Sequence, residues 1–334
     1  MRCSRFVTLL LALAMASSIA AQQSHREVLL LMGSRFELTA IAADTAQARA
    51  AVAAGIAEIA RIEALISSWQ PTSQTSAINR AAGRAPVKVS LELYLLISRA
   101  IKVSKLSDGA FDISFAAVDR IWTFDGRAYH KPHPDSVLAS VANIGYRHIL
   151  LDRTDTTVYL ARPGMKIGFG AIGKGYAANR ARRVMQDMGI RAGLVNAGGD
   201  LISWGAPPGR AAWGINIADP EDATRSLGWL QTNEMAVVTS GDYERYCLID
   251  GERYAHIVDP RTGMPVRGVQ SVTIVCPDAE LADALATTVF VMGVADGIAL
   301  IDRLRGVECL IVDDKGDVFH SKQLQLQRGH GGKP

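Results

Sequence analysis

Residues 282–288 read Ala-Asp-Ala-Leu-Ala-Thr-Thr and place one carboxylate and one hydroxyl four positions apart in an otherwise apolar stretch. On a helix, positions four apart share a face, so the oxygens of Asp283 and Thr287 point the same way. A carboxylate among apolar side chains is costly to bury without a partner, and a hard cation that prefers oxygen ligands is one such partner. The alternative is an ordinary helix, in which the Thr287 hydroxyl bonds to the Asp283 carbonyl and the Asp283 carboxylate caps a neighbouring loop.

On both sides of this stretch the hydrophobic pattern changes between the periods of strand and helix. The predicted helices cover residues 45–67, 90–109, 281–292 and 297–304, and another runs from the glycine-rich segment 168–175 to about residue 188. The predicted strands cover 148–151, 157–160, 192–195, 214–218, 235–239, 253–258, 269–276 and 308–312, and 28–41 reads as a hairpin or a bulged strand. Residues 71–83 read as a polar loop. We find no internal repeat and no convincing linker between separate domains.

The N-terminus has the pattern of a secretory signal. Arg2 and Arg5 precede an apolar segment, 6–16, that is shorter than the roughly 20 residues of a membrane-spanning helix. Ser18 and Ala20 fit the small-x-small pattern that precedes a cleavage site. We therefore predict a signal peptide over residues 1–21 and a soluble exported protein in the periplasm, with no transmembrane span in the mature chain. An uncleaved membrane anchor is the alternative.

The mature chain has the composition of a folded protein with little net charge. Of all 334 residues, 49% are hydrophobic, which excludes a disordered chain. Loss of Arg2 and Arg5 lowers the formal charge from +3 to +1, so no general basic field attracts nucleic acid. We predict one folded unit over residues 22–322. The polar, glycine-rich residues 323–334 are predicted to form a disordered tail.

Cysteine usage argues against a disulfide framework. Cys3 precedes the apolar segment of the signal, so it cannot be a lipidated cysteine after cleavage. The three cysteines that remain, Cys247, Cys276 and Cys309, are an odd number and sit among apolar neighbours. We interpret them as small buried hydrophobes. One disulfide is the competing interpretation.

The glycine-rich segment 168–175, Gly-Phe-Gly-Ala-Ile-Gly-Lys-Gly, leads into a predicted helix. The first turn of a helix has unsatisfied N–H groups and can bind a phosphate. The segment is neither a dinucleotide fingerprint nor a P-loop, because its glycine spacing matches neither motif and Lys174 precedes a glycine. The alternative is close packing of helix on strand. In the same way, the paired glycines of 196–200, Asn-Ala-Gly-Gly-Asp, can simply let a strand turn.

Two polar segments near residues 240–265 are dense in reactive side chains. His256 can act as a base or as a hydrogen-bond donor near neutral pH, although a single histidine on a strand is more often structural. Asp259 precedes Pro260, which forces an extended backbone and lets the Asp259 carboxylate cap the turn.

Together these motifs resemble one family, the ApbE family, over nearly the whole mature chain. The matching segments are Met32-Gly33-Ser34, Ser73 with Ser76 and Asn79, residues 107–112, 170–176, 196–200 and 240–243, residues 256–265, and residues 282–287. One departure is Gly168, which stands where many family members carry an aspartate. The resemblance implies an α+β fold with mainly antiparallel sheets and flanking helices in two interlocked lobes, and a cleft for FAD between them.

The resemblance also implies magnesium and FAD as ligands. The implied metal ligands are the Asp283 carboxylate, the Thr287 hydroxyl and the backbone oxygen of Ala171. Few protein ligands suffice, because Mg²⁺ keeps several waters and takes phosphate oxygens. The residues implied to contact the flavin nucleotide are Met32, Asn79, Gly109, Phe111, Asp112, Lys174, Tyr243 and Asp259.

Characterised members of the family transfer FMN from FAD to a threonine or serine hydroxyl of an acceptor protein and release AMP. The resemblance implies the same reaction here, with His256 orienting or deprotonating the attacking hydroxyl. Subunits of membrane redox complexes are the acceptors that we expect. Two alternatives stay open on sequence grounds: a periplasmic pyrophosphatase that splits FAD into FMN and AMP, and a flavin carrier without enzymatic activity.

Overall fold

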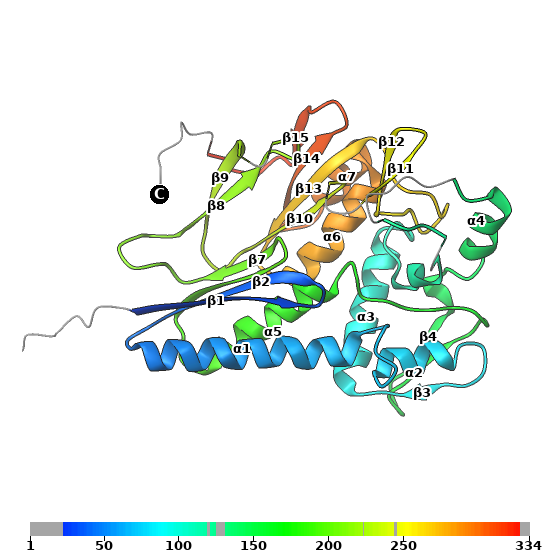
Figure 1. The fold of residues 1–334 in the computed structure, drawn as a ribbon, viewed down its shortest axis with the longest axis horizontal. Helices are drawn as coiled ribbons and strands as arrows, with labels where there is room; N and C mark the ends of the chain where they lie inside the picture. Colours follow the sequence, from blue (N-terminus) through cyan, green and yellow to red (C-terminus); the bar gives the residue numbers. More distant parts are fainter. Residues whose placement is uncertain (1–22, 119–120, 125–130, 223, 244–245, 328–334) are drawn as a thin grey trace, which may run out of the picture.

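Eight antiparallel strands form the central sheet of this protein, which we describe from a computed structural model (Figure 1). The structure describes residues 23–118, 121–124, 131–222, 224–243 and 246–327. In spatial order the strands are β1 (Gln23–Leu31), β2 (Ser34–Ala42), β6 (Ala192–Ala197), β7 (Asp200–Trp204), β10 (Ala236–Gly241), β13 (Val269–Cys276), β14 (Glu308–Asp313) and β15 (Val318–His320). Strands from both ends of the chain therefore belong to one sheet, which confirms the predicted α+β class with mainly antiparallel pairing.

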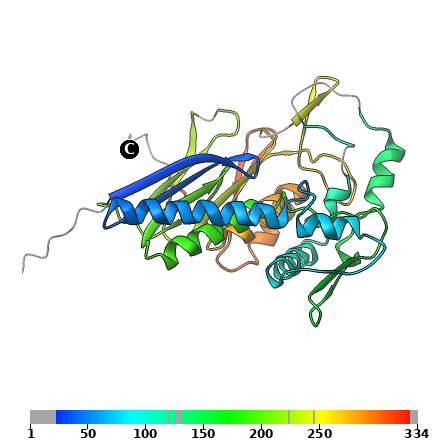
Figure 2. The same ribbon diagram turned by 60° about the horizontal axis from the view of Figure 1, so that its bottom comes forward.

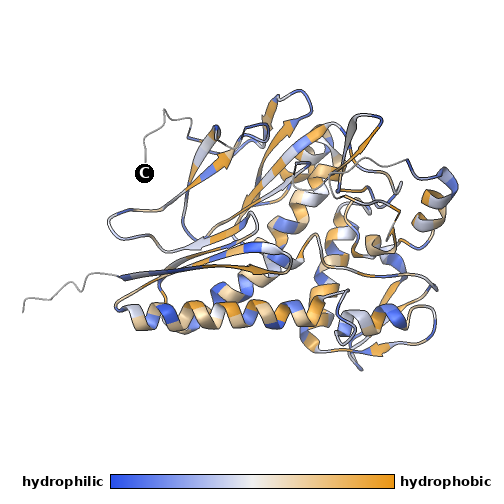
Figure 3. Ribbon diagram, in the orientation of Figure 1, coloured by the Kyte–Doolittle hydropathy of each residue, from blue (hydrophilic) through white to orange (hydrophobic). Residues whose placement is uncertain are grey.

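Three helices cover one face of this sheet, α1 (Thr45–Ile66), α5 (Gly173–Asp187) and α6 (Ala279–Met292) (Figure 2). Helix α1 begins where the Asp44 carboxylate accepts the N–H of Gln47 at 2.8 Å, a typical N-cap. Its buried residues recur at spacings of three and four, and Figure 3 shows apolar residues interspersed with polar ones along the helix. The core of the protein lies between these helices and the sheet.

A two-stranded sheet, β8 (Trp213–Ala218) and β9 (Ser226–Thr232), covers part of the opposite face. Ile217 and Leu230 from this hairpin pack against Val237 and other apolar residues of the central sheet. The C-terminal segment crosses the hairpin, because Gln327 pairs with Trp229 in an antiparallel bridge. The prediction of a disordered tail from residue 323 is therefore wrong for residues 323–327, which pack by apolar contacts. Residues 328–334 lie outside the described part of the chain.

The remaining elements lie around the end of the sheet where α3 is found (Figure 1). The helices are α2 (Gln74–Arg80), α3 (Leu91–Leu106), α4 (Pro134–Val141) and α7 (Val294–Ile301), with short 3-10 turns η1 (Ile113–Val118) and η2 (Tyr146–His148). A three-stranded sheet has the order β3 (Val87–Lys88), β5 (Thr157–Leu160), β4 (Ile149–Asp152), and β11 (Tyr246–Ile249) pairs with β12 (Glu252–Ala255).

Some elements carry too weak a local pattern to be predicted. The predicted polar loop 71–83 contains α2, a helix that Ser73 caps by accepting the N–H of Ser76 at 2.9 Å and that fully buries only one large apolar side chain, Ile78. The other unpredicted helices and strands are α4, β3, β7, β9, β11 and β15. All three residues of β15 are exposed, so it has no alternating pattern to detect.

Charged side chains join three of the helices. Arg61 of α1 binds Glu58 and also Glu92 of α3, with nitrogen–oxygen distances of 2.7–2.9 Å. Arg180 of α5 donates to Glu58 at 2.9 Å, and the hydroxyl of Tyr176 donates to Glu92 at 2.7 Å. The hydrogen bonds from Arg61 lower the pKa of Glu92 to about 2, against the effect of burial. This network fixes the first turns of α5 against α1 and α3.

Two further predictions concern the N-terminus and the thiols. No helix in the described ranges combines the length and apolar character needed to cross a membrane. The predicted signal peptide, residues 1–21, lies outside the described residues. Cys247, Cys276 and Cys309 are buried and form no disulfide within the described residues, which agrees with their interpretation as small buried hydrophobes.

Candidate functional site

The buried carboxylate of Asp283 lies where α5 and α6 cross. Asp283 is only 3% exposed, and its Oδ2 accepts the backbone N–H of Gly175 at 2.9 Å. Gly175 is in the first turn of α5, where N–H groups have no partner within the helix. A helix N-terminus also carries partial positive charge, which favours an ionised carboxylate. The Asp283 carboxylate thus caps the glycine-rich segment at the start of α5, as the alternative without a metal predicted for this side chain.

Glycine at position 175 is required by how closely the two helices approach. A Cβ added to Gly175 would lie 2.1 Å from the carbonyl oxygen of Ala279, the first residue of α6. Asp278 caps α6 by accepting the N–H of Leu281 at 2.9 Å, and Asn179 of α5 binds Asp278 and the N–H of Ala279. These contacts fix the crossing that brings Asp283 to the glycine-rich segment.

The two neighbouring threonines of α6 differ in their bonding. Thr288 is buried, and its hydroxyl donates to the carbonyl of Ala284 at 2.7 Å. Thr287 is half-buried, and within the described residues its hydroxyl makes no hydrogen bond. The alternative assigned to Thr287 a hydrogen bond from its hydroxyl to the carbonyl four residues earlier. In the structure Thr288 makes this type of bond, and Thr287 does not. The Thr287 hydroxyl, one turn beyond Asp283 on the same face, keeps its lone pairs for a ligand.

Ala171, the third predicted metal ligand, lies in the turn just before α5. The N–H of Gly175 donates to Asp283, and the N–H of Tyr176 donates to Ile172 at 3.0 Å. Over the described ranges, no hydrogen bond to the carbonyl oxygen of Ala171 is found. An acceptor next to a helix start without a donor is uncommon, because buried and half-buried carbonyls usually have a partner.

The three predicted ligands fit magnesium by the chemistry of their donors. They supply a carboxylate, a hydroxyl and a carbonyl, and Mg²⁺ prefers oxygen. In the part of the chain that the structure describes, no three His, Cys, Asp or Glu side chains gather as a metal cluster. A site with only one carboxylate needs phosphate oxygens and water to complete the metal's coordination.

Lys174 was predicted to contact the flavin nucleotide, and the structure pairs it with a carboxylate. Its Nζ lies 2.8 Å from Oδ2 of Asp200, whose side chain is 2% exposed. Burial raises the pKa of Asp200, and the charge of Lys174 opposes this rise. Next to this pair lies Met32, whose Cε is 3.6 Å from where a Cβ of Gly173 would be. The hairpin turn after β1, the glycine-rich segment and the turn before β7 therefore meet at one place.

Asn79 fixes the segment that leads into the glycine-rich turn. Its side-chain amide donates to the carbonyl of Ile167 at 2.9 Å and accepts the N–H of Ile167 at 2.8 Å. The N–H of Gly168 donates to the carbonyl of Ile113 at 2.9 Å, and a Cβ on Gly168 would lie 3.1 Å from that of Ala116. The glycine that departs from the family pattern thus sits in a space too tight for a larger side chain without movement of Ala116.

The turn 109–112 is held together by its own side chains. Asp112 accepts the N–H and the hydroxyl of Ser114 at 2.8 and 2.7 Å and the N–H of Tyr146 at 2.6 Å. Burial raises the pKa of Asp112 despite these bonds. Phe111 is buried in the core, and Gly109 adopts a φ of +81° that favours glycine. These contacts serve the fold of the turn, and contact with a nucleotide stays a prediction.

His256 lies at a bend directly after β12, and not on the strand as predicted. Its ring meets the ring of Phe124 edge to face, with centroids 6.5 Å apart and planes at 73°. Trp122 stacks on Phe124 and on Tyr254, and its indole N–H donates to the carbonyl of Gly263 at 2.8 Å. This aromatic cluster could not be predicted from the sequence, because Trp122 and Phe124 lie far from His256 in the chain.

Asp259 caps its turn, as its place before Pro260 predicted. Its Oδ1 accepts the N–H of Arg261 at 2.8 Å, and its backbone carbonyl accepts the N–H of Gly263 at 2.8 Å. The guanidinium of Arg261 also binds the carboxylate at 2.9 Å. The Asp259 carboxylate is therefore engaged within its own turn, and its predicted contact with FAD stays a prediction.

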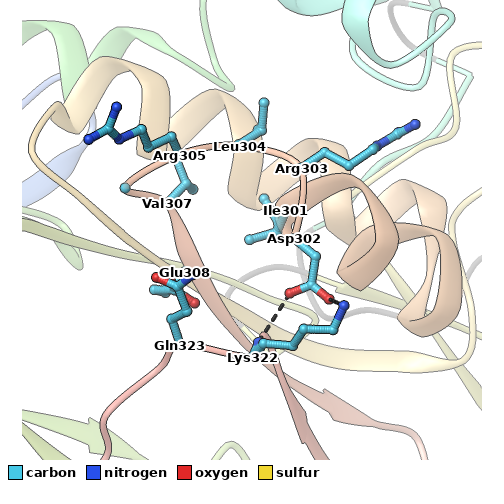
Figure 4. Close-up of a pocket in the computed structure, with 10 residues that line it drawn as sticks. Ile301, Asp302, Arg303, Leu304, Arg305, Val307, Glu308, Lys322 and Gln323 are labelled. Carbon is cyan, nitrogen blue, oxygen red and sulfur yellow. Dashed lines mark hydrogen bonds and ion pairs between the residues drawn. The ribbon is translucent and has the colours of Figure 1, made fainter.

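Two cavities differ in their relation to these residues. One of about 180 Å³ lies between the central sheet and β8 and is lined by Asn196, Gly199, Leu201, Ile215, Asn216, Ile217, Ala218, Val237, Thr239 and Tyr243. It adjoins the turn before β7 and includes Tyr243, a predicted nucleotide contact that is 40% exposed. The other, of about 260 Å³, lies at the end of α7 (Figure 4), where Lys322 is already paired with Asp302 at 3.3 Å. No predicted site residue lines the second cavity.

Comparisons with known proteins all point to the same family. The sequence model of the ApbE family matches residues 32–311. The FAD:protein FMN transferase of Klebsiella pneumoniae (strain 342) is 34% identical over 271 residues, which cover 80% of this chain and 84% of that protein. The FAD:protein FMN transferase of Treponema pallidum (strain Nichols) is 32% identical over 282 residues, which cover 80% of this chain and 76% of that protein.

Solved structures give the same result for the fold. The crystal structure of the ApbE protein from Thermotoga maritima has a TM-score of 0.83 and 33% identity, covering 90% of this chain and 97% of that chain. The apo form of Pseudomonas stutzeri flavinyl transferase ApbE has a TM-score of 0.80 and 25% identity, and the match covers 90% of this chain and 95% of that chain.

Proposed function

The chain belongs to the ApbE family, and we propose that it is an FAD:protein FMN transferase that uses Mg²⁺. The structural observation that supports Mg²⁺ is the Thr287 hydroxyl, which lies one helical turn from the buried Asp283 carboxylate and makes no hydrogen bond within the described residues. The hydrogen bond from the Gly175 N–H places the Asp283 carboxylate beside the first turn of α5, and Ala171 lies four residues before Gly175 in the chain. This arrangement suits a cation bound to a diphosphate.

In the proposed reaction, a threonine or serine hydroxyl of the acceptor attacks the phosphorus next to riboflavin. A new oxygen–phosphorus bond forms, the bond from that phosphorus to the bridging oxygen breaks, and AMP leaves with that oxygen. Asp283, Thr287 and the Ala171 carbonyl would hold Mg²⁺, which when bound supplies neutralisation of the negative charge on the diphosphate and on the departing AMP.

His256 is proposed to accept the proton of the attacking hydroxyl and to release it later to solvent. Its position supports this role in one respect: the ring is half-buried against Phe124, so packing restricts its orientation. A base held in one orientation contributes more than a mobile one, because less freedom is lost on reaching the transition state.

We propose that part of the FAD molecule binds in the cavity that Tyr243 lines. Its apolar walls, from Leu201, Ile215, Ile217 and Val237, suit a planar ring system, and its amide and hydroxyl groups can bind polar edges. The cavity lies next to the turn that contacts Lys174, so one extended ligand can span both places.

We also propose that the protein is exported through its N-terminal signal, residues 1–21, and works in the periplasm. Subunits of membrane redox complexes that display a threonine or serine are the proposed acceptors. N-terminal sequencing of the protein isolated from the periplasmic fraction tests the first point: a start near residue 21 or 22 is expected, and a start at Met1 would contradict it.

The experiment that tests the function uses the purified mature chain, FAD, Mg²⁺ and an acceptor subunit. Flavin fluorescence on the acceptor in a denaturing gel, with one AMP released for each flavin attached, is the expected result. AMP release without attached flavin would identify the pyrophosphatase alternative. Tight binding of FAD without any AMP would identify the carrier alternative.

A further inference from the structure

Asp200 is a buried carboxylate whose surroundings point to a role beyond local folding. It is the first residue of β7 and is 1% exposed. It follows Gly198 and Gly199, both with positive φ, so the chain turns sharply just before it. A charge buried this deeply is strongly unfavourable unless it is paired.

Its partner, Lys174, lies in the first turn of α5, next to the residue that binds Asp283. Lys174 Nζ is 2.8 Å from Asp200 Oδ2, and Lys174 is the second residue of α5. The next residue, Gly175, donates its N–H to Asp283. The ion pair and the backbone N–H that binds the proposed metal ligand are therefore on adjacent residues, Lys174 and Gly175.

The packing around the pair is tight enough to transmit a change in position. A Cβ on Gly198 would lie 2.8 Å from Cβ of Ser34 and 3.9 Å from Cδ of Lys174. A Cβ on Gly173 would lie 2.8 Å from Cδ1 of Ile66. The first turn of α5 is thus enclosed between the hairpin turn after β1, the turn before β7 and the end of α1.

We propose that Lys174 and Asp200 form a positioning pair, which holds the first turn of α5 so that the Gly175 N–H meets Asp283, and that Lys174 does not bind the FAD phosphates directly. The ammonium already has a buried counter-ion at the distance of a charge-assisted hydrogen bond. This inference rests on the proposed function, because it assigns a role within the FAD site.

A positioning pair and a direct contact of Lys174 with the FAD phosphates predict different results for three variants. The variants are Asp200→Asn, Lys174→Met and the double variant. The measurement is FAD affinity from quenching of flavin fluorescence in excess Mg²⁺. For a positioning pair, each single variant weakens FAD binding by roughly 10–100-fold, the usual effect of losing a residue that orients a ligand. The double variant leaves no unpaired charge, so it recovers to within about tenfold of the unmodified protein.

A direct phosphate contact gives a different pattern that would overturn the inference. Asp200→Asn would then release the ammonium, and FAD would bind at least as tightly as before. The double variant would be as weak as Lys174→Met. Should Asp200→Asn not fold, the double variant decides by itself, because only a positioning role lets it bind FAD almost normally.

A matched control separates this effect from general destabilisation. The exposed pair Lys322 and Asp302, 3.3 Å apart at the end of α7, lies away from the predicted site residues, so Asp302→Asn with Lys322→Met should leave FAD affinity unchanged. FMN transfer by the unmodified protein is assayed in parallel. Failure of that assay alone rejects the proposed function, and absence of coupling between Lys174 and Asp200 alone rejects the positioning pair.

Discussion

The backbone N–H of Gly175 donates a 2.9 Å hydrogen bond to the side chain of Asp283, which joins the first turn of α5 to the middle of α6. The two residues are 108 positions apart in sequence, and the bond forms only because glycine lets the helices approach closely. An acidic residue in an apolar helix thereby has a backbone hydrogen-bond donor for one of its carboxylate oxygens.

The neighbouring threonines of α6 give a sharp test of the metal ligands. Thr287→Val removes the hydroxyl that has no hydrogen bond within the described residues, so FMN transfer should fall by roughly 10–100-fold and the Mg²⁺ concentration for half-maximal rate should rise. Thr288→Val removes a hydroxyl that is bonded to Ala284 and should leave the rate close to normal. Equal losses in both variants would contradict the assignment of Thr287.

Gly175→Ala should be poorly tolerated. The new Cβ would lie 2.1 Å from the Ala279 carbonyl oxygen, so α5 and α6 must separate. We expect a loss of stability of about 1–3 kcal/mol or more, measured by urea denaturation, together with weaker FAD binding. Gly170→Ala in the same segment is the control, since its Cβ would meet only Phe115 at 3.6 Å. Equal stability of the two variants would show that the helices do not depend on this contact.

His256→Ala should separate catalysis from binding. Loss of a general base lowers the rate of transfer by about 100- to 10,000-fold, while FAD affinity should be nearly unchanged. Phe124→Leu removes the ring against which His256 packs and should give a smaller loss of rate. Transfer at the normal rate by His256→Ala would remove this residue from the reaction.

The buried thiols predict how stability changes at high pH. Burial raises the pKa of Cys276 and of Cys309 from 9.0 to about 11. Between these values the unfolded chain releases protons that the folded protein keeps, so the free energy of unfolding should fall as pH rises from 9 to 11. Cys276→Ala with Cys309→Ala should reduce this slope in urea titrations. A slope unchanged by the double substitution would contradict the assignment.

The same burial predicts slow thiol chemistry in the native state. At pH 8 both groups are protonated and enclosed, so a thiol reagent should react slowly with the folded mature protein. After unfolding, three thiols should react, from Cys247, Cys276 and Cys309. Fewer than three would indicate the disulfide that the sequence left open.

Strongly periodic elements could be predicted from the sequence. Helix α1 buries Val52, Ile59 and Ile62 on one stripe, and the pattern of that stripe placed the helix to within one residue. By contrast, α2 has only Ile78 as a large, fully buried apolar side chain, and its polar residues gave no period. Strand β15 is exposed throughout and is held by backbone pairing with β14, which leaves no mark on its composition.

The site could be predicted only in part for a similar reason. The unusual composition around Asp283 identified a buried carboxylate in need of a partner. Its partner is a backbone N–H, which every residue except proline carries, so the sequence could not select Gly175. The pairing of Lys174 with Asp200 and the packing of Phe124 on His256 depend on long-range folding in the same way.

The proposed function requires that Asp283 helps to hold Mg²⁺ against the diphosphate of FAD. Calorimetric titration of FAD into the purified mature protein, with Mg²⁺ or with excess EDTA, tests it most directly, with Asp283→Asn titrated in parallel. We expect EDTA to weaken FAD binding by more than about tenfold in the unmodified protein and to have little further effect in Asp283→Asn. FAD affinity that is the same with Mg²⁺ and with EDTA, in a protein that still transfers FMN, would contradict the claim.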